Sequence, residues 1–123
     1  MKMSSVLFEK NLQRTNEKRT MLIAKLARVG PLCVGNVYDV MRRCGNPYCH
    51  CAKKPGHKQT LLIYTQKGRR YCKLVRRKDE ERIKQAWQNY RLFRQALREL
   101  RAINKRELSN LMAEIENRRL YYK

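Results

Sequence analysis

The chain has 123 residues, which suits one domain with a modest hydrophobic core. It carries 30 Lys and Arg against 10 Asp and Glu, a formal net charge of +20. No run of about 18 apolar residues is present, so we expect no membrane-spanning helix and no membrane partner. No secretory signal precedes the first charged residues, which predicts a cytoplasmic protein.

The first element expected along the chain is a helix over residues 4–29. Ser4 or Ser5 can cap its N-terminus, and the Gly30-Pro31 pair that follows is a common stop signal. The apolar side chains of this helix gather near its two ends, and residues 13–20 between them are polar on all sides. Such a helix needs another element to pack against its apolar ends.

A β-region is expected next. Val37-Tyr38-Asp39-Val40-Met41, after a turn at Gly35-Asn36, has the composition of a strand. Residues 60–65 form a second predicted strand and residues 70–75 its partner, joined by a turn over residues 66–69. These strands predict a small antiparallel sheet. Alternation along the last strand would place Tyr71 and Lys73 on one face and Arg70 and Cys72 on the other.

Between the first two predicted strands, residues 44–57 are rich in cysteine and histidine. Turn formers at residues 45–47 let the backbone curl, so that three thiolates and one imidazole can converge on a tetrahedral metal. Disulfides are disfavoured because the cysteine count is odd, 5 in all, and no secretory signal is present. We therefore predict a structural zinc site that pins one end of the sheet, with the ligands Cys44, Cys49, Cys51 and His57.

The fourth zinc ligand has two alternatives to His57, namely Cys72 and His50. An open, catalytic zinc is disfavoured, because such sites have a carboxylate base nearby and residues 40–78 contain no Asp or Glu. Asp39 is the sole acid between residues 18 and 78, which leaves no carboxylate cluster for Mg²⁺ either. We therefore expect a protein that is not an enzyme.

A long helix is expected from Asp79 to about Tyr121, opened by acidic residues that favour a helix N-terminus. Its apolar residues recur every three or four positions, with a slip of five near residues 104–110 that predicts a kink, a break or supercoil drift. The stripe consists of Ile83, Trp87, Tyr90, Phe93, Leu97, Leu100, Ile103, Leu108, Leu111 and Ile115. Because it is longer than the first helix can cover, we predict a helical hairpin or a coiled-coil homodimer.

Together these elements predict an α+β fold in one globular unit. Its parts are an N-terminal helix over residues 1–30, a basic zinc-knuckle β-domain over residues 31–78, and a long C-terminal helix over residues 79–123.

The predicted zinc region is strongly basic and contains no acid between residues 40 and 78. Its basic residues are Arg42, Arg43, Lys53, Lys54, Lys58, Lys67, Arg69, Arg70, Lys73, Arg76, Arg77 and Lys78. A field of this density is most often neutralised by a polyanion, so we predict that these residues contact the phosphates of a nucleic acid. A second row on the long helix is either a solvated face or a further phosphate surface: Arg91, Arg94, Arg98, Arg101 and Lys105.

The function predicted from these features is a zinc-stabilised nucleic-acid-binding accessory protein. The sequence leaves DNA and RNA open, since basic hairpins suit either, and four tyrosines can stack on unpaired bases: Tyr38, Tyr48, Tyr64 and Tyr71. The alternative is a non-catalytic assembly adaptor that holds a protein or ribonucleoprotein partner through its long helices.

The order of motifs resembles a known family. Its specific part runs from Arg43-Cys44-Gly45 to Cys51-Ala52 with His57, followed by a Lys-Gly turn and a helix with Asn89-Tyr90-Arg91. Over about residues 20–105 the chain resembles small basic proteins of bacteria and archaea that are catalogued as a domain of unknown function and often encoded near transposase genes. The resemblance implies a link to mobile genetic elements and to a mobile-element protein partner.

Overall fold

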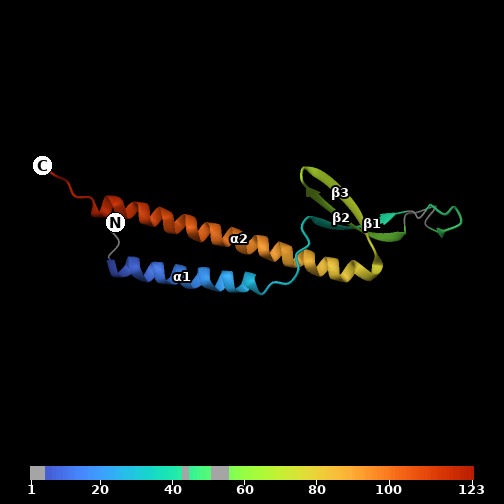
Figure 1. Cartoon of the computed structure of the whole chain (residues 1–123), viewed down its shortest axis with the longest axis horizontal. Helices are drawn as coiled ribbons and strands as arrows, with labels where there is room; N and C mark the ends of the chain where they lie inside the picture. Colours follow the sequence, from blue (N-terminus) through green and yellow to red (C-terminus); the bar gives the residue numbers. More distant parts are fainter. Residues whose placement is uncertain (1–4, 43–44, 51–55) are drawn as a thin grey trace. The chain divides into compact units, whose positions relative to one another are not determined.

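The computed structural model describes residues 5–42, 45–50 and 56–123. Its elements, in chain order, are α1 (Ser5–Ala27), β1 (Asn36–Arg42), β2 (His57–Gln66), β3 (Arg69–Val75) and α2 (Arg77–Arg118) (Figure 1). This confirms the predicted α+β fold, with an N-terminal helix, a small antiparallel sheet and a long C-terminal helix. The chain divides into two compact units, one formed by Gly30–Arg91 and one by Met1–Val29 with Leu92–Lys123.

In the helical unit, α1 and the later part of α2 pair in antiparallel directions. Near the middle of α1, the Arg19 guanidinium donates a hydrogen bond to Asn104 over 3.0 Å and forms an ion pair with Glu107. Near the start of α1, the Phe8 ring has the Arg118 guanidinium 5.9 Å from its centroid. Residues earlier in α1 contact residues later in α2, so the two helices run in opposite directions, as in a helical hairpin.

Helix α2 runs without a break through residues 104–110, where the apolar stripe slips by five positions. It begins two residues before the predicted start and ends at Arg118. Ala96 and Ile103 are its buried residues, while Leu108 and Ile115 are 60% and 69% exposed. The slip therefore turns the later part of the stripe away from the buried side of the helix.

The sheet has the strand order β1-β2-β3, with both pairs antiparallel. Val37, Thr60 and Leu61 are buried at its centre. Val37 lies opposite Leu62, and Thr60 lies opposite Val75. The turn between β2 and β3 has positive φ at both central residues, 50° at Lys67 and 78° at Gly68. Positive φ at both positions defines the two-residue turn whose twist matches paired strands, which explains the tight hairpin.

Three hydrogen bonds tie the first turns of α2 to the segment that leads into β1. The indole Nε1 of Trp87 donates to the Gly35 carbonyl over 2.9 Å, and the amide of Asn89 donates to the Pro31 carbonyl over 3.2 Å. The backbone N–H of Cys33 donates to the carbonyl at residue 86 over 3.0 Å. These bonds hold residues 31–35 in place, so β1 enters the sheet from a fixed position.

Candidate metal site and nucleic-acid interface

The structure brings together two of the four predicted zinc ligands. The Sγ atom of Cys49 lies 3.0 Å from Nε2 of His57, at the start of β2, and both residues are partly buried. Two ligands of one tetrahedral zinc, at about 2.3 Å for sulfur and 2.0 Å for nitrogen, lie roughly 3.5 Å apart. The observed separation is close to that value. The other two predicted ligands, Cys44 and Cys51, lie outside the described residues.

The two alternatives to His57 differ sharply in position. His50 lies beside the pair, with Nδ1 3.8 Å from the Cys49 sulfur and its ring centroid 5.3 Å from that of His57. Cys72 is exposed on β3 opposite Ile63, six residues along β2 from His57. At about 3.3 Å per residue this is roughly 20 Å, too far for a shared metal ion.

Within residues 5–42, 45–50 and 56–123, no group of three or more His, Cys, Asp or Glu side chains is arranged to hold a metal ion. A zinc ion held by Cys49 and either histidine would need further ligands from outside the described residues, where the predicted ligands Cys44 and Cys51 lie. The Cys49 sulfur and the nearby His57 imidazole nitrogen are the donor types that zinc prefers. The donor set of the described residues fits zinc.

Nine of the twelve predicted phosphate contacts lie in the described part of the chain, and all nine are exposed. Arg43, Lys53 and Lys54 lie outside it. Lys67, Arg69, Arg70 and Lys73 lie on the β2–β3 turn and on β3, and we call these four the basic hairpin. Arg76, Arg77 and Lys78 follow at the junction with α2, Arg42 ends β1, and Lys58 lies in β2.

Lys58 differs from the other eight described residues in its electrostatic surroundings. Its Nζ atom lies 3.6 Å from a carboxylate oxygen of Asp39 and 3.4 Å from one of Glu80. None of the other eight forms an ion pair with an acid that the structure describes. Lys58 is therefore already neutralised, while the basic hairpin and the junction with α2 keep a surplus of positive charge.

Two tyrosines lie on β2 and β3 beside the basic hairpin. The rings of Tyr64 and Tyr71, directly opposite each other on β2 and β3, stack with centroids 5.1 Å apart and planes inclined by 18°. The Lys73 ammonium lies 5.8 Å from the centroid of Tyr71. Tyr71 and Lys73 thus share one face of the sheet, as alternation along the strand predicts. Aromatic and basic groups occur side by side on this face.

The basic row of α2 is also exposed, at Arg91, Arg94, Arg98, Arg101 and Lys105. The Arg91 guanidinium lies 5.1 Å from the Trp87 ring centroid, which holds it against the helix surface. The spacing of the row keeps these side chains along one side of α2, where they form a basic strip.

Sequence analysis missed a cluster of charged groups that links β1, β2 and α2. The hydroxyl oxygen of buried Thr60 lies 2.9 Å from a carboxylate oxygen of Asp39 and 2.9 Å from one of Glu80. One hydroxyl proton serves one carboxylate at a time. The Lys84 ammonium reaches both carboxylates, over 3.0 and 3.1 Å. The i,i+4 spacing of Glu80 and Lys84 signals their pairing, but only the fold adds Asp39 and Thr60.

The cluster shifts the pKa values of Asp39, Glu80 and Lys84. Hydrogen bonds from Lys84 and then Thr60 hold the pKa of Asp39 below its ordinary value. Hydrogen bonds from Thr60 and then Lys84 do the same for the pKa of Glu80. The same contacts, first with Asp39 and then with Glu80, raise the pKa of Lys84. Asp39, the sole acid between residues 18 and 78, is therefore engaged in holding the sheet to α2.

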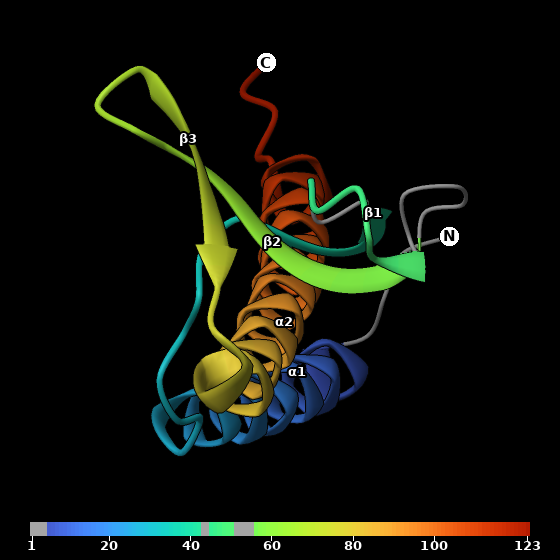
Figure 2. The same ribbon diagram turned by 90° about the vertical axis from the view of Figure 1, so that its right-hand side faces the viewer.

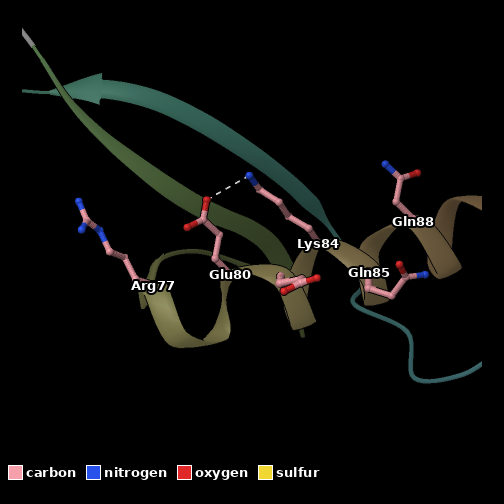
Figure 3. A pocket seen from close by; sticks show the side chains of 6 residues that line it. Arg77, Glu80, Lys84, Gln85 and Gln88 are labelled. Carbon is pink, nitrogen blue, oxygen red and sulfur yellow. Dashed lines mark hydrogen bonds and ion pairs between the residues drawn. The ribbon is translucent and has the colours of Figure 1, made fainter.

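An open pocket of about 380 Å³ lies beside this cluster, on the first turns of α2 (Figure 3). It is lined by Arg77, Glu80, Glu81, Lys84, Gln85 and Gln88. Figure 3 shows Lys84 reaching toward Glu80, while Arg77 extends away from that ion pair. Because the lining mixes both signs of charge, this pocket is a poorer place for a phosphate than the basic hairpin.

No helix in the described part of the chain is long and apolar enough to cross a membrane.

Residues 11–85 match the model of a domain of unknown function (DUF6788). This range covers more than half of the chain and includes every predicted zinc ligand and every predicted phosphate contact. The chain therefore belongs to this family. No curated protein and no solved structure matches the chain.

Proposed function

We propose that this member of the DUF6788 family is a zinc-stabilised nucleic-acid-binding accessory protein. One observation carries the proposal: the basic hairpin and the junction with α2 present exposed Arg and Lys side chains that no described acid neutralises. Such a surface gains free energy by exchanging its counterions for phosphates, because binding releases the ions condensed on the nucleic acid.

The charge distribution supports a specific contact surface. The acids that lie near the sheet are occupied, since Asp39 and Glu80 pair with Lys58 and Lys84. The basic hairpin is separated from this cluster along β2 and β3, so its field is not cancelled locally. We therefore place the first phosphate contacts on the basic hairpin and further contacts on the basic strip of α2.

Zinc would be held by Cys44, Cys49, Cys51 and His57, with His50 as the alternative to His57. Its chemistry there is structural: it would tie the segment between β1 and β2 to the start of β2. The side chains of the basic hairpin carry the binding itself. The engagement of Asp39 by Thr60 and Lys84 supports a binding role over a catalytic one, because that carboxylate is not free to act as a base.

The resemblance to small basic proteins encoded near transposase genes supports a link to a mobile genetic element, with a protein of that element as a partner. The proposed zinc-bound thiolates would suit a cytoplasmic location, because thiols there stay reduced. Binding to fragments from the ends of an element found beside the gene, compared with unrelated fragments of equal length, tests the link. Equal affinity for both sets would contradict it.

The salt dependence of binding tests the proposed function. Fluorescence anisotropy with labelled duplex and single-stranded oligonucleotides, across a series of salt concentrations, gives the slope of log affinity against log salt. Replacing Arg69 and Arg70 together by Ala should reduce the steepness of the slope for duplex DNA by about 1.8, because two phosphate contacts are lost. The matched control replaces Arg118 and Arg119 by Ala, which removes the same charge from residues already paired with Glu114 and Glu116.

The control should leave the slope nearly unchanged. Affinity that does not depend on salt, or an equal change in the two double variants, would contradict phosphate binding by the basic hairpin.

The second candidate function is an assembly adaptor, and one observation favours it. On α2, Leu108, Met112 and Ile115 lie along one side of the helix at spacings of four and three, and each is at least 60% exposed. Such an apolar row suits a second copy of the chain or a protein partner. Light scattering of the purified protein and of an Ile115→Lys variant tests for a homodimer. Recovery of a protein partner without nucleic acid would favour the adaptor over the nucleic-acid-binding function.

A further inference from the structure

The end of the β2–β3 hairpin extends beyond the rest of the sheet. The pairing of β1 with β2 stops where Asn36 lies opposite Ile63, whereas β2 and β3 remain paired as far as Gln66 and Arg69 (Figure 2). Residues 64–71 therefore form a two-stranded extension. Four of the exposed basic residues, the basic hairpin, lie on this extension or next to it.

The stacked tyrosines lie at the base of this extension. Both rings are partly exposed, and their planes are nearly parallel. Tyr71 is on β3, an edge strand, so in the described sheet no further strand lies on the side of Tyr71 away from Tyr64. The ammonium of Lys73, an exposed residue, lies over the Tyr71 ring, 5.8 Å from its centroid. A flat aromatic group can displace it at little cost.

Alternation along β3 also places Arg69 on the same face as Tyr71 and Lys73. The aromatic ring thus lies between two cationic side chains, each two residues away, or about 7 Å along the strand. Cross-strand tyrosine pairs also stabilise hairpins by themselves, and that role requires no charge around them. The two flanking cations and the lack of any acid between residues 40 and 78 add what a nucleotide requires.

We propose that Tyr71, supported from behind by Tyr64, is a stacking platform for an unpaired base. Arg69 and Lys73 hold the phosphates on either side of that base. The occupant is thus a single-stranded segment of nucleic acid, because the base faces inside a duplex are covered by neighbouring bases and cannot reach a side chain ring. This inference rests on the proposed nucleic-acid binding and specifies the form of nucleic acid that stacks on Tyr71, while the phosphates of a duplex can still contact the basic hairpin.

The experiment measures fluorescence anisotropy of three labelled probes of equal length: oligo(dT), oligo(U) and a blunt DNA duplex. Tyr71→Ala should weaken binding of both single strands about tenfold, because one base loses its stacking partner, and should leave duplex affinity unchanged. Tyr71→Phe should retain the wild-type affinity, since the ring remains. The control Tyr122→Ala removes the same side chain from a fully exposed position outside both helices and should change nothing.

Tyr71→Leu guards against loss of the hairpin, because leucine keeps apolar packing against Tyr64 but offers no flat ring. It should lose single-strand affinity as Tyr71→Ala does while circular dichroism stays unchanged. The relative affinity of oligo(dT) and oligo(U) then separates DNA from RNA.

Two results would overturn the inference while sparing the proposed function: equal weakening of duplex and single strands by Tyr71→Ala, or wild-type single-strand affinity in that variant. A wild-type protein that binds none of the three probes would overturn both.

Discussion

The sulfur of Cys49 lies 3.0 Å from Nε2 of His57, the first residue of β2. If this pair ligates zinc, Cys49→Ser and His57→Ala should each release the metal, measured by elemental analysis of the purified protein. Chelation of the wild type should then lower its thermal midpoint, because a protein with a structural zinc site loses folding free energy when the metal is removed. Cys72→Ser is the matched control and should retain zinc, since Cys72 lies far along the sheet.

A wild-type protein that contains no zinc, or that keeps its midpoint after chelation, would show that these cysteines serve another purpose. Zinc loss in His50→Ala with retention in His57→Ala would instead assign the fourth ligand to His50.

Trp87 anchors α2 to the segment before β1 by a single hydrogen bond to the Gly35 carbonyl. Trp87→Phe keeps most of the ring but removes the donor, so the free energy of unfolding should fall by about 1 kcal/mol. Urea denaturation followed by circular dichroism measures this change, because the variant lacks the sole tryptophan of the chain. A change below the error of the measurement would mean that water replaces the indole as donor without loss.

Gly35 has φ of +125°, and an added Cβ would lie 2.4 Å from the backbone oxygen of Ile63 in β2. Gly35→Ala should therefore destabilise the sheet unit by about 3 kcal/mol, since both the backbone conformation and the contact are unfavourable. Gly30→Ala is the matched control: its Cβ would meet the Asn89 side chain at an ordinary distance of 3.4 Å. Equal unfolding free energies for the two variants, measured by urea denaturation, would contradict this account of the strand entry.

The cluster of charged groups around Thr60 predicts how the free energy of unfolding depends on pH. The pKa values of Asp39 and Glu80 are lowered by folding from the ordinary values of 3.8 and 4.5. The unfolded chain therefore binds more protons than the folded chain in this range, and stability increases with pH there. The contribution of the two carboxyls is complete above about pH 5 and is lost as the pH falls through their folded pKa values.

Urea midpoints measured between neutral and strongly acidic pH test this prediction. Asp39→Asn should flatten the acid-side fall, whereas Glu81→Gln, an exposed acid that forms no ion pair with a described residue, should leave it intact. The same fall in both variants would place the titrating groups elsewhere. On the alkaline side, the pKa of Lys84 is raised by folding, so its contribution is complete below its ordinary value of 10.5 and is lost as the pH rises through the folded pKa.

Much of the fold follows from local sequence signals. Gly30-Pro31 predicts the end of α1, which closes at Ala27, and Lys67-Gly68 predicts the turn between β2 and β3. The turn also sets the register that places Tyr64 opposite Tyr71. The end of α1 and the turn between β2 and β3 could be predicted for one reason. Gly and Pro permit or restrict particular backbone angles whatever the rest of the chain does.

The candidate site was predicted less completely. The basic residues were found by composition, since an excess of charge needs no fold to be seen. The ion pairs of Lys58 were not predicted, because its partners Asp39 and Glu80 come from β1 and α2. The sequence predicted an apolar stripe longer than the first helix can cover. It did not say that Leu108 and Ile115 would be the residues left exposed, because periodicity places residues on a side of a helix but does not say what covers that side.

The sequence by itself determined the order of helices and strands, the tight hairpin and the excess of positive charge, because these depend on neighbours within a few residues. The tertiary structure alone decided which charges are neutralised. It brought Thr60, Asp39 and Glu80 together, set Cys49 beside His57 and separated Cys72 from both. The physical reason is that such contacts join residues far apart in the chain, so their distances depend on strand register and helix packing, which no local pattern contains.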